Sequence, residues 1–168
     1  MAVGPLSYSE THLKTLIAMV LIGSATVASA VFAQQQKETT MHHAHGTFTV
    51  DVHPLSPAPA EGLTRYTINK VIHGDLEATT KGEMFGAGDY KLGVAGYVGI
   101  EMVTGTLGGK QGSFALQHFA TMDASGPKMQ IIVSPGSGTG ELKGITGTFT
   151  IKIENGQHFY DFDYALPE

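Results

Sequence analysis

The chain has 168 residues and a formal net charge of −5, with 10 Lys and Arg against 15 Asp and Glu and no Cys or Trp. A nucleic-acid surface needs clustered basic side chains, and this chain has a single Arg and scattered Lys, so nucleic acid is excluded as a partner. Without Cys, the fold must be stabilised by packing and sheet closure rather than by disulfides.

Residues 1–33 have the pattern of an export signal peptide. Lys14 supplies a positive charge, an apolar run extends from Leu16 to Val27, and small-residue cleavage sites end at Ala30 and Ala33. The run is shorter than the roughly 20 residues of a membrane-spanning helix and is interrupted by small polar residues. We expect cleavage after Ala33, or else after Ala30, export of a bacterial protein to the periplasm or the medium, and no membrane contact of the mature chain.

Residues 34–45 are polar and are expected to form a flexible leader. His42, His43 and His45 lie close together here, and such a run captures Cu²⁺ or Zn²⁺ adventitiously. In a flexible leader nothing would orient these ligands. We therefore predict a solvated leader, no dedicated metal site and no cofactor.

Residues 46–168 are expected to form one domain of short strands, because apolar residues alternate with polar ones between turn residues. Prolines mark 54–62 as a loop, Gly86–Tyr90 is predicted as a second loop, and Asn155-Gly156 is the signature of a type I′ hairpin turn. The predicted strands are 46–52, 63–73, 76–85, 93–105, 112–122, 128–134, 146–154 and 157–166. Eight strands in successive hairpins favour a closed, all-β antiparallel barrel, whose interior holds side chains or one small ligand.

The glycine-rich segment 134–144 superficially resembles a phosphate-binding loop. It lacks the Gly-Lys-Ser/Thr ending and no helix is predicted after it, so a P-loop is excluded. We expect turns at the barrel rim, held together by Thr139 and Glu141.

Four segments in this order resemble the DUF3224 family: GDLEATTKGEMF, AGYVGIEMVTGTLGGKQGSFALQH, VSPGSGTGELKGITG and NGQHFYDFDYAL. The resemblance covers about 46–166. It implies a fold similar to the allene oxide cyclase barrel, in the neighbourhood of the dirigent proteins, whose members bind apolar or phenolic molecules and in some cases guide a cyclisation. The family itself carries no activity that transfers residue by residue.

A carboxylate and an imidazole occur within apolar runs, Glu101 in YVGIEMV and His118 in the following strand. A turn centred on Gly109-Lys110 places them opposite each other, whereas a turn at Gly108-Gly109 pairs Glu101 with Leu116. If Glu101 points inward, it needs a partner such as His118 or Tyr97, and the pair would suit acid/base catalysis. If Val98, Ile100 and Met102 form the packed face instead, Glu101 faces solvent.

Tyr97, Phe114 and Leu116 share a face with Glu101 and are candidate ligand-binding residues of the lumen. Glu83, in the third predicted strand, is a further candidate for the same lumen.

Three functions fit this sequence. The first is an exported barrel that binds a small apolar or aromatic molecule, as a monomer or small homo-oligomer. The second is an enzyme of cyclase, isomerase or lyase type with Glu101 and His118 as acid and base. The third is a structural or interaction module whose barrel is filled by its own side chains. Binding ranks first, because no motif fixes a reaction and a fold does not imply a function.

Overall fold

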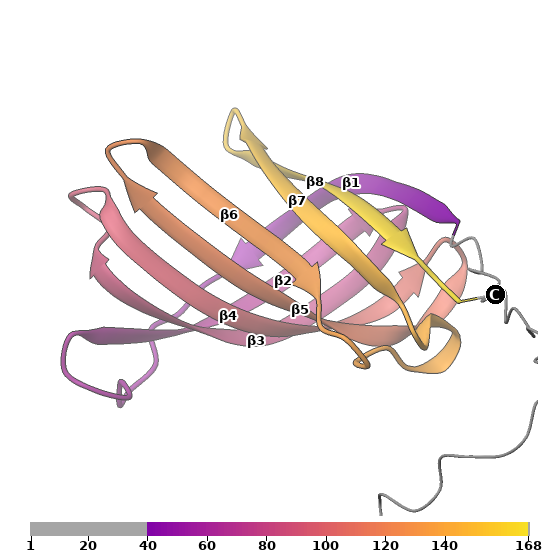
Figure 1. The fold of residues 1–168 in the computed structure, drawn as a ribbon, viewed down its shortest axis with the longest axis horizontal. Helices are drawn as coiled ribbons and strands as arrows, with labels where there is room; N and C mark the ends of the chain where they lie inside the picture. Colours follow the sequence, from indigo (N-terminus) through magenta and orange to yellow (C-terminus); the bar gives the residue numbers. More distant parts are fainter. Residues whose placement is uncertain (1–39, 168) are drawn as a thin grey trace, which may run out of the picture. The chain divides into compact units, whose positions relative to one another are not determined.

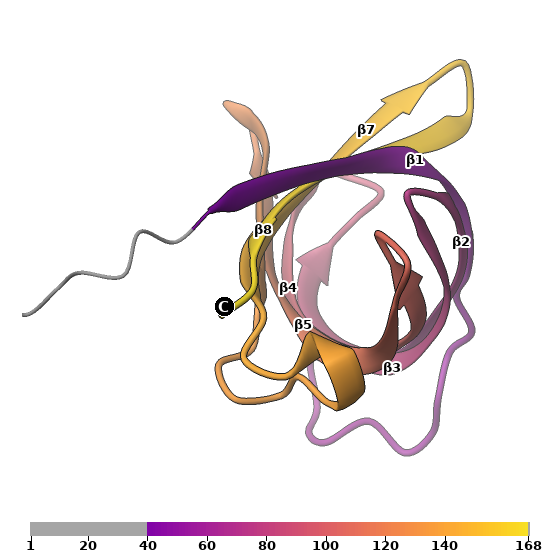
Figure 2. The same cartoon turned by 90° about the vertical axis from the view of Figure 1, so that its right-hand side faces the viewer.

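The computed structural model describes residues 40–167, which form a closed barrel of eight antiparallel strands in chain order (Figure 1). Figure 2, turned by 90°, shows the strands arranged as a ring. The predicted fold class is confirmed, and the predicted signal peptide lies outside the described residues. The strands are β1 (Met41–Asp51), β2 (Leu63–Gly74), β3 (Leu76–Asp89), β4 (Val94–Leu107), β5 (Lys110–Asp123), β6 (Gly126–Val133), β7 (Thr146–Glu154) and β8 (Gln157–Ala165).

β1 begins earlier than the sequence suggested, at Met41 rather than Gly46. The extra residues pair with the end of β8, where Met41 lies opposite Ala165, and Ala44 is buried in the core. Ala44 is the only apolar side chain between Met41 and Gly46, so the segment has too little alternation to predict a strand. Its pairing partner lies more than a hundred residues away in the sequence. The prediction of a flexible leader is therefore wrong for residues 41–45, and residues 34–39 lie outside the described residues.

The β4–β5 hairpin turns at Gly108-Gly109, where both residues have positive φ, 55° and 81°. Glu101 is therefore paired with Leu116 and not with His118, which lies opposite Gly99. The two registers considered from the sequence differ by two residues, so both keep the same side chains on the inner face. β3 also continues through Gly86–Asp89, which had been predicted as a loop, because these residues pair with Val94–Tyr97 of β4.

One half of the barrel is filled by its own side chains. Tyr160 of β8 stacks with Phe149 of β7, and Phe162 of β8 stacks with Phe114 of β5. The rings of Phe162 and Phe149 are in contact at a tilt of 50°. The hydroxyl oxygen of Tyr160 accepts the backbone N–H of Leu76 at 2.9 Å, so even this buried phenol is satisfied. Buried side chains therefore occupy this half of the interior.

The rim loop between β6 and β7 is tied down as expected. The Glu141 carboxylate accepts the backbone N–H of Gln111 at 2.8 Å, and Thr139 Oγ1 accepts that of Ser113 at 3.1 Å. The loop contains a short 3-10 helix, η2 (Gly140–Leu142), which buries Leu142. Across residues 40–167, no helix is both long and apolar enough to span a bilayer.

The seam between β6 and β7 is the weakest closure of the ring. The two strands share a single pair, Ile132 with Thr148, whereas β7 and β8 are paired along their whole length. Beyond this pair lies the half of the barrel opposite the filled half. That half is therefore less tightly closed.

Candidate functional site

A cluster of four buried polar side chains lies inside the barrel. Lys70, Thr80, Glu101 and His118 come from β2, β3, β4 and β5 respectively, and each is less than 5% exposed. Buried polar groups must be paired to avoid a large desolvation cost. In this barrel the four side chains are paired with one another.

Glu101 is the centre of the cluster. Its Oε1 forms an ion pair with Lys70 Nζ and lies 2.9 Å from His118 Nε2. Its Oε2 accepts the hydroxyl of Thr80 at 2.7 Å, and Thr80 Oγ1 in turn accepts the backbone N–H of Lys70 at 2.9 Å. The predicted inward orientation of Glu101 and its contact with His118 are confirmed, and two unpredicted partners complete the network.

The network fixes the protonation of Glu101. Burial by itself raises the pKa of Glu101, but the hydrogen bond with His118 and the charge of Lys70 outweigh it and lower the pKa from 4.5 to about 2. Burial lowers the pKa of Lys70, and the neighbouring Glu101 carboxylate opposes that effect. An ionised carboxylate only accepts hydrogen bonds, so His118 Nε2 carries the hydrogen between them.

Gly82 makes room for Glu101. The two residues are directly paired between β3 and β4, and a Cβ atom at position 82 would lie 2.5 Å from Glu101 Cβ, closer than packing allows. A glycine within a strand often marks such a close approach. Gly82 is thus part of the site, although it contributes no side chain.

A pocket of about 400 Å³ opens at the end of the barrel opposite the filled half. Lys70 and His118 belong to its wall, while Glu101 and Thr80 do not. The remaining polar residues of the wall are Tyr66, Tyr90, Tyr97 and His158, and the apolar ones are Phe48, Val50, Val52, Ile68, Met84, Met129, Ile151 and Ile153. Its size lies within the range of small-molecule sites, and so does its composition, mostly apolar with a few polar groups.

Three polar residues of the wall differ in their surroundings. Lys70 Nζ lies 5.7 Å from the ring centroid of Phe48, within the range of a cation–π contact. Burial raises the pKa of Tyr97, which keeps its phenol uncharged at neutral pH. Nδ1 of His118 is buried and has no hydrogen-bond partner among the described residues.

The predicted ligand-binding residues separate into three places. Tyr97 lies on the pocket wall, as expected. Phe114 and Leu116 are fully buried in the filled half and do not line the pocket, because they lie beyond His118 towards the β4–β5 turn. They are interior residues, as the sequence predicted, but they do not belong to the wall of this pocket.

Glu83 does not face the lumen, contrary to the prediction. It lies opposite Ile100, which is 51% exposed, and therefore on the outer face. There it forms two hydrogen bonds with Arg65, at 2.7 and 2.8 Å. The outer face also carries Val98 and Met102, so the alternative in which these residues are packed and Glu101 faces solvent is excluded.

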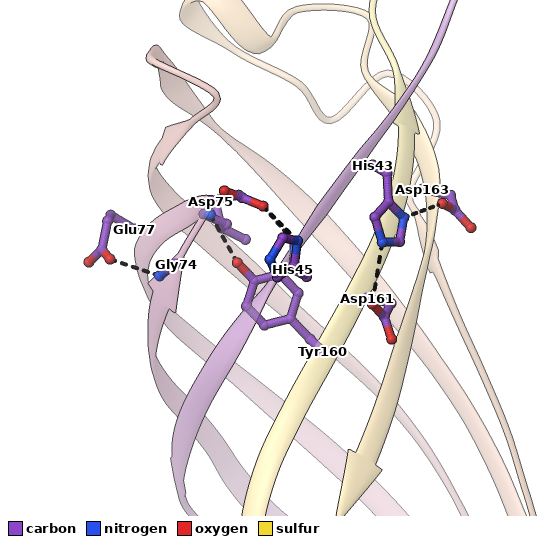
Figure 3. Close-up of polar contacts among 9 residues, drawn as sticks. His43, His45, Gly74, Asp75, Glu77, Tyr160, Asp161 and Asp163 are labelled. Atoms are coloured by element: carbon purple, nitrogen blue, oxygen red, sulfur yellow. Dashed lines mark hydrogen bonds and ion pairs between the residues drawn. The ribbon is translucent and has the colours of Figure 1, made fainter.

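His43 and His45, near the start of β1, contact different carboxylates (Figure 3). His43 Nδ1 lies 2.8 Å from Asp163 and its Nε2 lies 3.4 Å from Asp161, while His45 Nδ1 lies 3.0 Å from Asp75. The hydrogen bond to Asp163 raises the pKa of His43. Within residues 40–167, no group of three potential ligands converges in a way that would hold a metal ion.

Comparison with known proteins identifies the family. The family model described as "Protein of unknown function (DUF3224)" matches residues 44–164. The chain belongs to the DUF3224 family. A crystal structure of a DUF3224 protein of unknown function from Shewanella oneidensis MR-1 is 43% identical, with a TM-score of 0.69, and covers 77% of this chain and 100% of that chain. No curated protein matches the chain.

The DUF3224 match extends from Ala44, the first buried residue of β1, to Tyr164 near the end of β8. It therefore includes the whole buried cluster and the pocket wall. The match confirms the resemblance seen in the sequence, and it supplies no activity.

Lys70 and Thr80 are the members of the cluster that sequence reasoning missed. A signal for Lys70 existed, since at a period of two it shares a face with Ile68 and Ile72, both of which are buried. Val71, an apolar residue that is 44% exposed, obscures this alternation. Threonine occurs on both faces of strands, so Thr80 gave no signal.

Proposed function

We propose that this protein binds a small apolar or aromatic molecule in the open half of its barrel. The observation that carries the proposal is the division of the interior into a filled half and a pocket of about 400 Å³, with Lys70 and His118 where the two meet. A barrel serving only as a structural module has no need for such a pocket or for a buried ion pair beside it.

The pocket wall favours an apolar or aromatic occupant. Phe48 and the tyrosines offer ring faces, and Met84 and Met129 are flexible side chains that adapt to the shape of a ligand. Met129 and Ile151 belong to β6 and β7, the strands that share a single pair, so the weakest seam of the barrel adjoins the pocket. A hydrophobic molecule has a route into the lumen at this end.

Binding is favoured over acid/base catalysis by the state of Glu101. Its side chain is fully buried, is absent from the pocket wall and is already bonded to Lys70, Thr80 and His118. A general base must reach the proton that it abstracts. Glu101 is better suited to positioning Lys70 and His118 than to reacting with a substrate.

The first experiment is mass spectrometry of protein purified from its natural host under native conditions. A carrier protein co-purifies with its bound ligand. We therefore expect a small organic molecule that is released by denaturation and is absent from a mock purification. Protein that arrives empty, and that binds none of a set of small aromatic and aliphatic compounds in solution, would contradict the proposal.

A variant that fills the pocket locates the binding site. Ile151→Trp places a larger side chain in the pocket wall, and Thr150→Trp places the same side chain on the outer face of the adjacent position. We expect the first to abolish binding and the second to preserve it, with both proteins folded by circular dichroism. Equal binding by the two variants would place the ligand elsewhere.

We also propose that the protein acts after export. The support is the order of positive charge, apolar run and small-residue cleavage sites in residues 1–33. N-terminal sequencing of protein from the cell envelope or medium is expected to give Gln34, or Val31 for the alternative site. Protein that still begins at Met1 would contradict export by cleavage.

A further inference from the structure

The buried cluster of Lys70, Thr80, Glu101 and His118 lies at the floor of the pocket, and its charges balance each other. Lys70 contributes one positive charge and Glu101 one negative charge, and they form a direct ion pair. His118 gives its Nε2 hydrogen to Glu101, and a second hydrogen on Nδ1 would find no acceptor among the described residues. A neutral imidazole leaves the cluster with no net charge.

Apart from Lys70, the wall of the pocket contains no Asp, Glu, Lys or Arg. Tyr66, Tyr90 and Tyr97 are phenols, and His158 packs its ring against Phe48 at a centroid distance of 5.0 Å. Glu83 and Arg65 pair on the outer face, away from the lumen. A charged ligand would therefore lose its hydration without finding a free counter-charge among Asp, Glu, Lys and Arg side chains, which is unfavourable for a buried ion.

The floor nevertheless offers hydrogen bonds to an uncharged group. An ammonium group has three N–H donors, and within the described part of the chain only one acceptor, Glu101, is found for Lys70 Nζ. Lys70 belongs to the pocket wall, so a ligand oxygen is able to accept from it. A hydroxyl or carbonyl oxygen meets this requirement without adding charge.

We infer that the ligand is an uncharged molecule with an apolar or aromatic body and a hydroxyl or carbonyl oxygen that accepts a hydrogen bond from Lys70. This inference rests on the proposed function and specifies its ligand class. Carboxylic acids, which are ionised at neutral pH, and amines, which are protonated, are selected against by the same balanced ion pair.

The test compares three probes with the same ring system, 2-naphthol, 2-naphthoate and 2-naphthylmethylamine, by isothermal titration calorimetry at about pH 7. The first is neutral, the second is an anion and the third is a cation. We expect 2-naphthol to bind at least about tenfold more tightly than either charged probe, because an unpaired buried charge costs more than tenfold in affinity.

Changing one charge of the pair is expected to reverse the preference. Glu101→Gln leaves Lys70 without its counter-charge, so 2-naphthoate should become the tightest probe. Lys70→Met leaves Glu101 unpaired, so the amine should gain. Glu83→Gln is the matched control, because it makes the same change in net charge on the outer face and should leave the preference unchanged.

The outcomes separate the two proposals. Binding of none of the three probes contradicts an aromatic-binding lumen and removes the basis for the inference. Binding of 2-naphthoate or the amine as tightly as 2-naphthol by the wild-type protein leaves the binding function standing and overturns the inference. This comparison needs no variant, so it decides the matter even if Glu101→Gln or Lys70→Met fails to fold.

Discussion

Lys70 of β2 and Glu101 of β4 form an ion pair within the barrel, with β3 between their strands and both side chains almost inaccessible to water. Thr80, on that intervening strand, bonds to the second oxygen of Glu101 and to the backbone of Lys70. The pair therefore connects three consecutive strands through side chains as well as through the backbone ladder. It also decides the chemistry of the pocket floor.

Removing one member of the pair should destabilise the protein more than removing both. Lys70→Met leaves a buried carboxylate without its cation, and the expected loss in the free energy of unfolding is about 3–5 kcal/mol. The double variant Lys70→Met with Glu101→Leu removes both charges and should lose less than Lys70→Met alone. Chemical denaturation of the wild type, both single variants and the double variant measures this coupling. Additive losses would mean that the two side chains do not interact.

The stability of the fold should fall in acid through the titration of Glu101. Its pKa is about 2 in the folded protein against an ordinary 4.5, so the folded state favours the carboxylate. The resulting stabilisation is fully present above about pH 4.5 and is lost as the pH falls towards 2. Its size is on the order of 3 kcal/mol. Denaturation curves measured between these pH values, for the wild type and for Glu101→Gln, isolate this contribution, and parallel pH profiles would contradict it.

A methyl group at position 82 should disturb the site. In Gly82→Ala the new Cβ would meet Glu101 Cβ at 2.5 Å and the carbonyl oxygen of Ile100 even closer, so the paired strands must move apart. We expect a loss of about 1–3 kcal/mol, the usual cost of overpacking. Gly99→Ala is the matched control, since its nearest neighbour is Met84 Cβ at 3.2 Å and a smaller shift relieves it. Melting midpoints compare the two, and a larger loss for Gly99→Ala would contradict the explanation.

The β7–β8 hairpin has the turn that Asn155-Gly156 predicted, with φ of 51° and 79° at the two residues. Gly156→Val should reduce the free energy of unfolding by about 1 kcal/mol or more, because a β-branched residue is strained at positive φ. The strain is purely a matter of the backbone, since a Cβ at this position has no neighbour within 4 Å. Asn155→Gly is the control and should retain stability. An unchanged melting midpoint for Gly156→Val would show that another turn forms in solution.

The sequence determined most of the strands because their signals are local. Alternation, Pro and Gly residues placed the strands, and Asn155-Gly156 identified a turn type from two residues. It also singled out Glu101 and His118, because polar residues inside apolar runs require an explanation. Each of these inferences needs only residues that are neighbours in the chain.

Only the tertiary structure decided what these residues contact. Glu83 and Glu101 both lie in strands, yet one faces Arg65 on the outside and the other faces Lys70 in the interior, and alternation does not say which face of a strand points inward. The start of β1 at Met41 depends on pairing with Ala165 at the far end of the chain. Lys70, Thr80 and Glu101 meet because closure of the barrel turns one face of every strand inward, where desolvation forces their polar groups to pair.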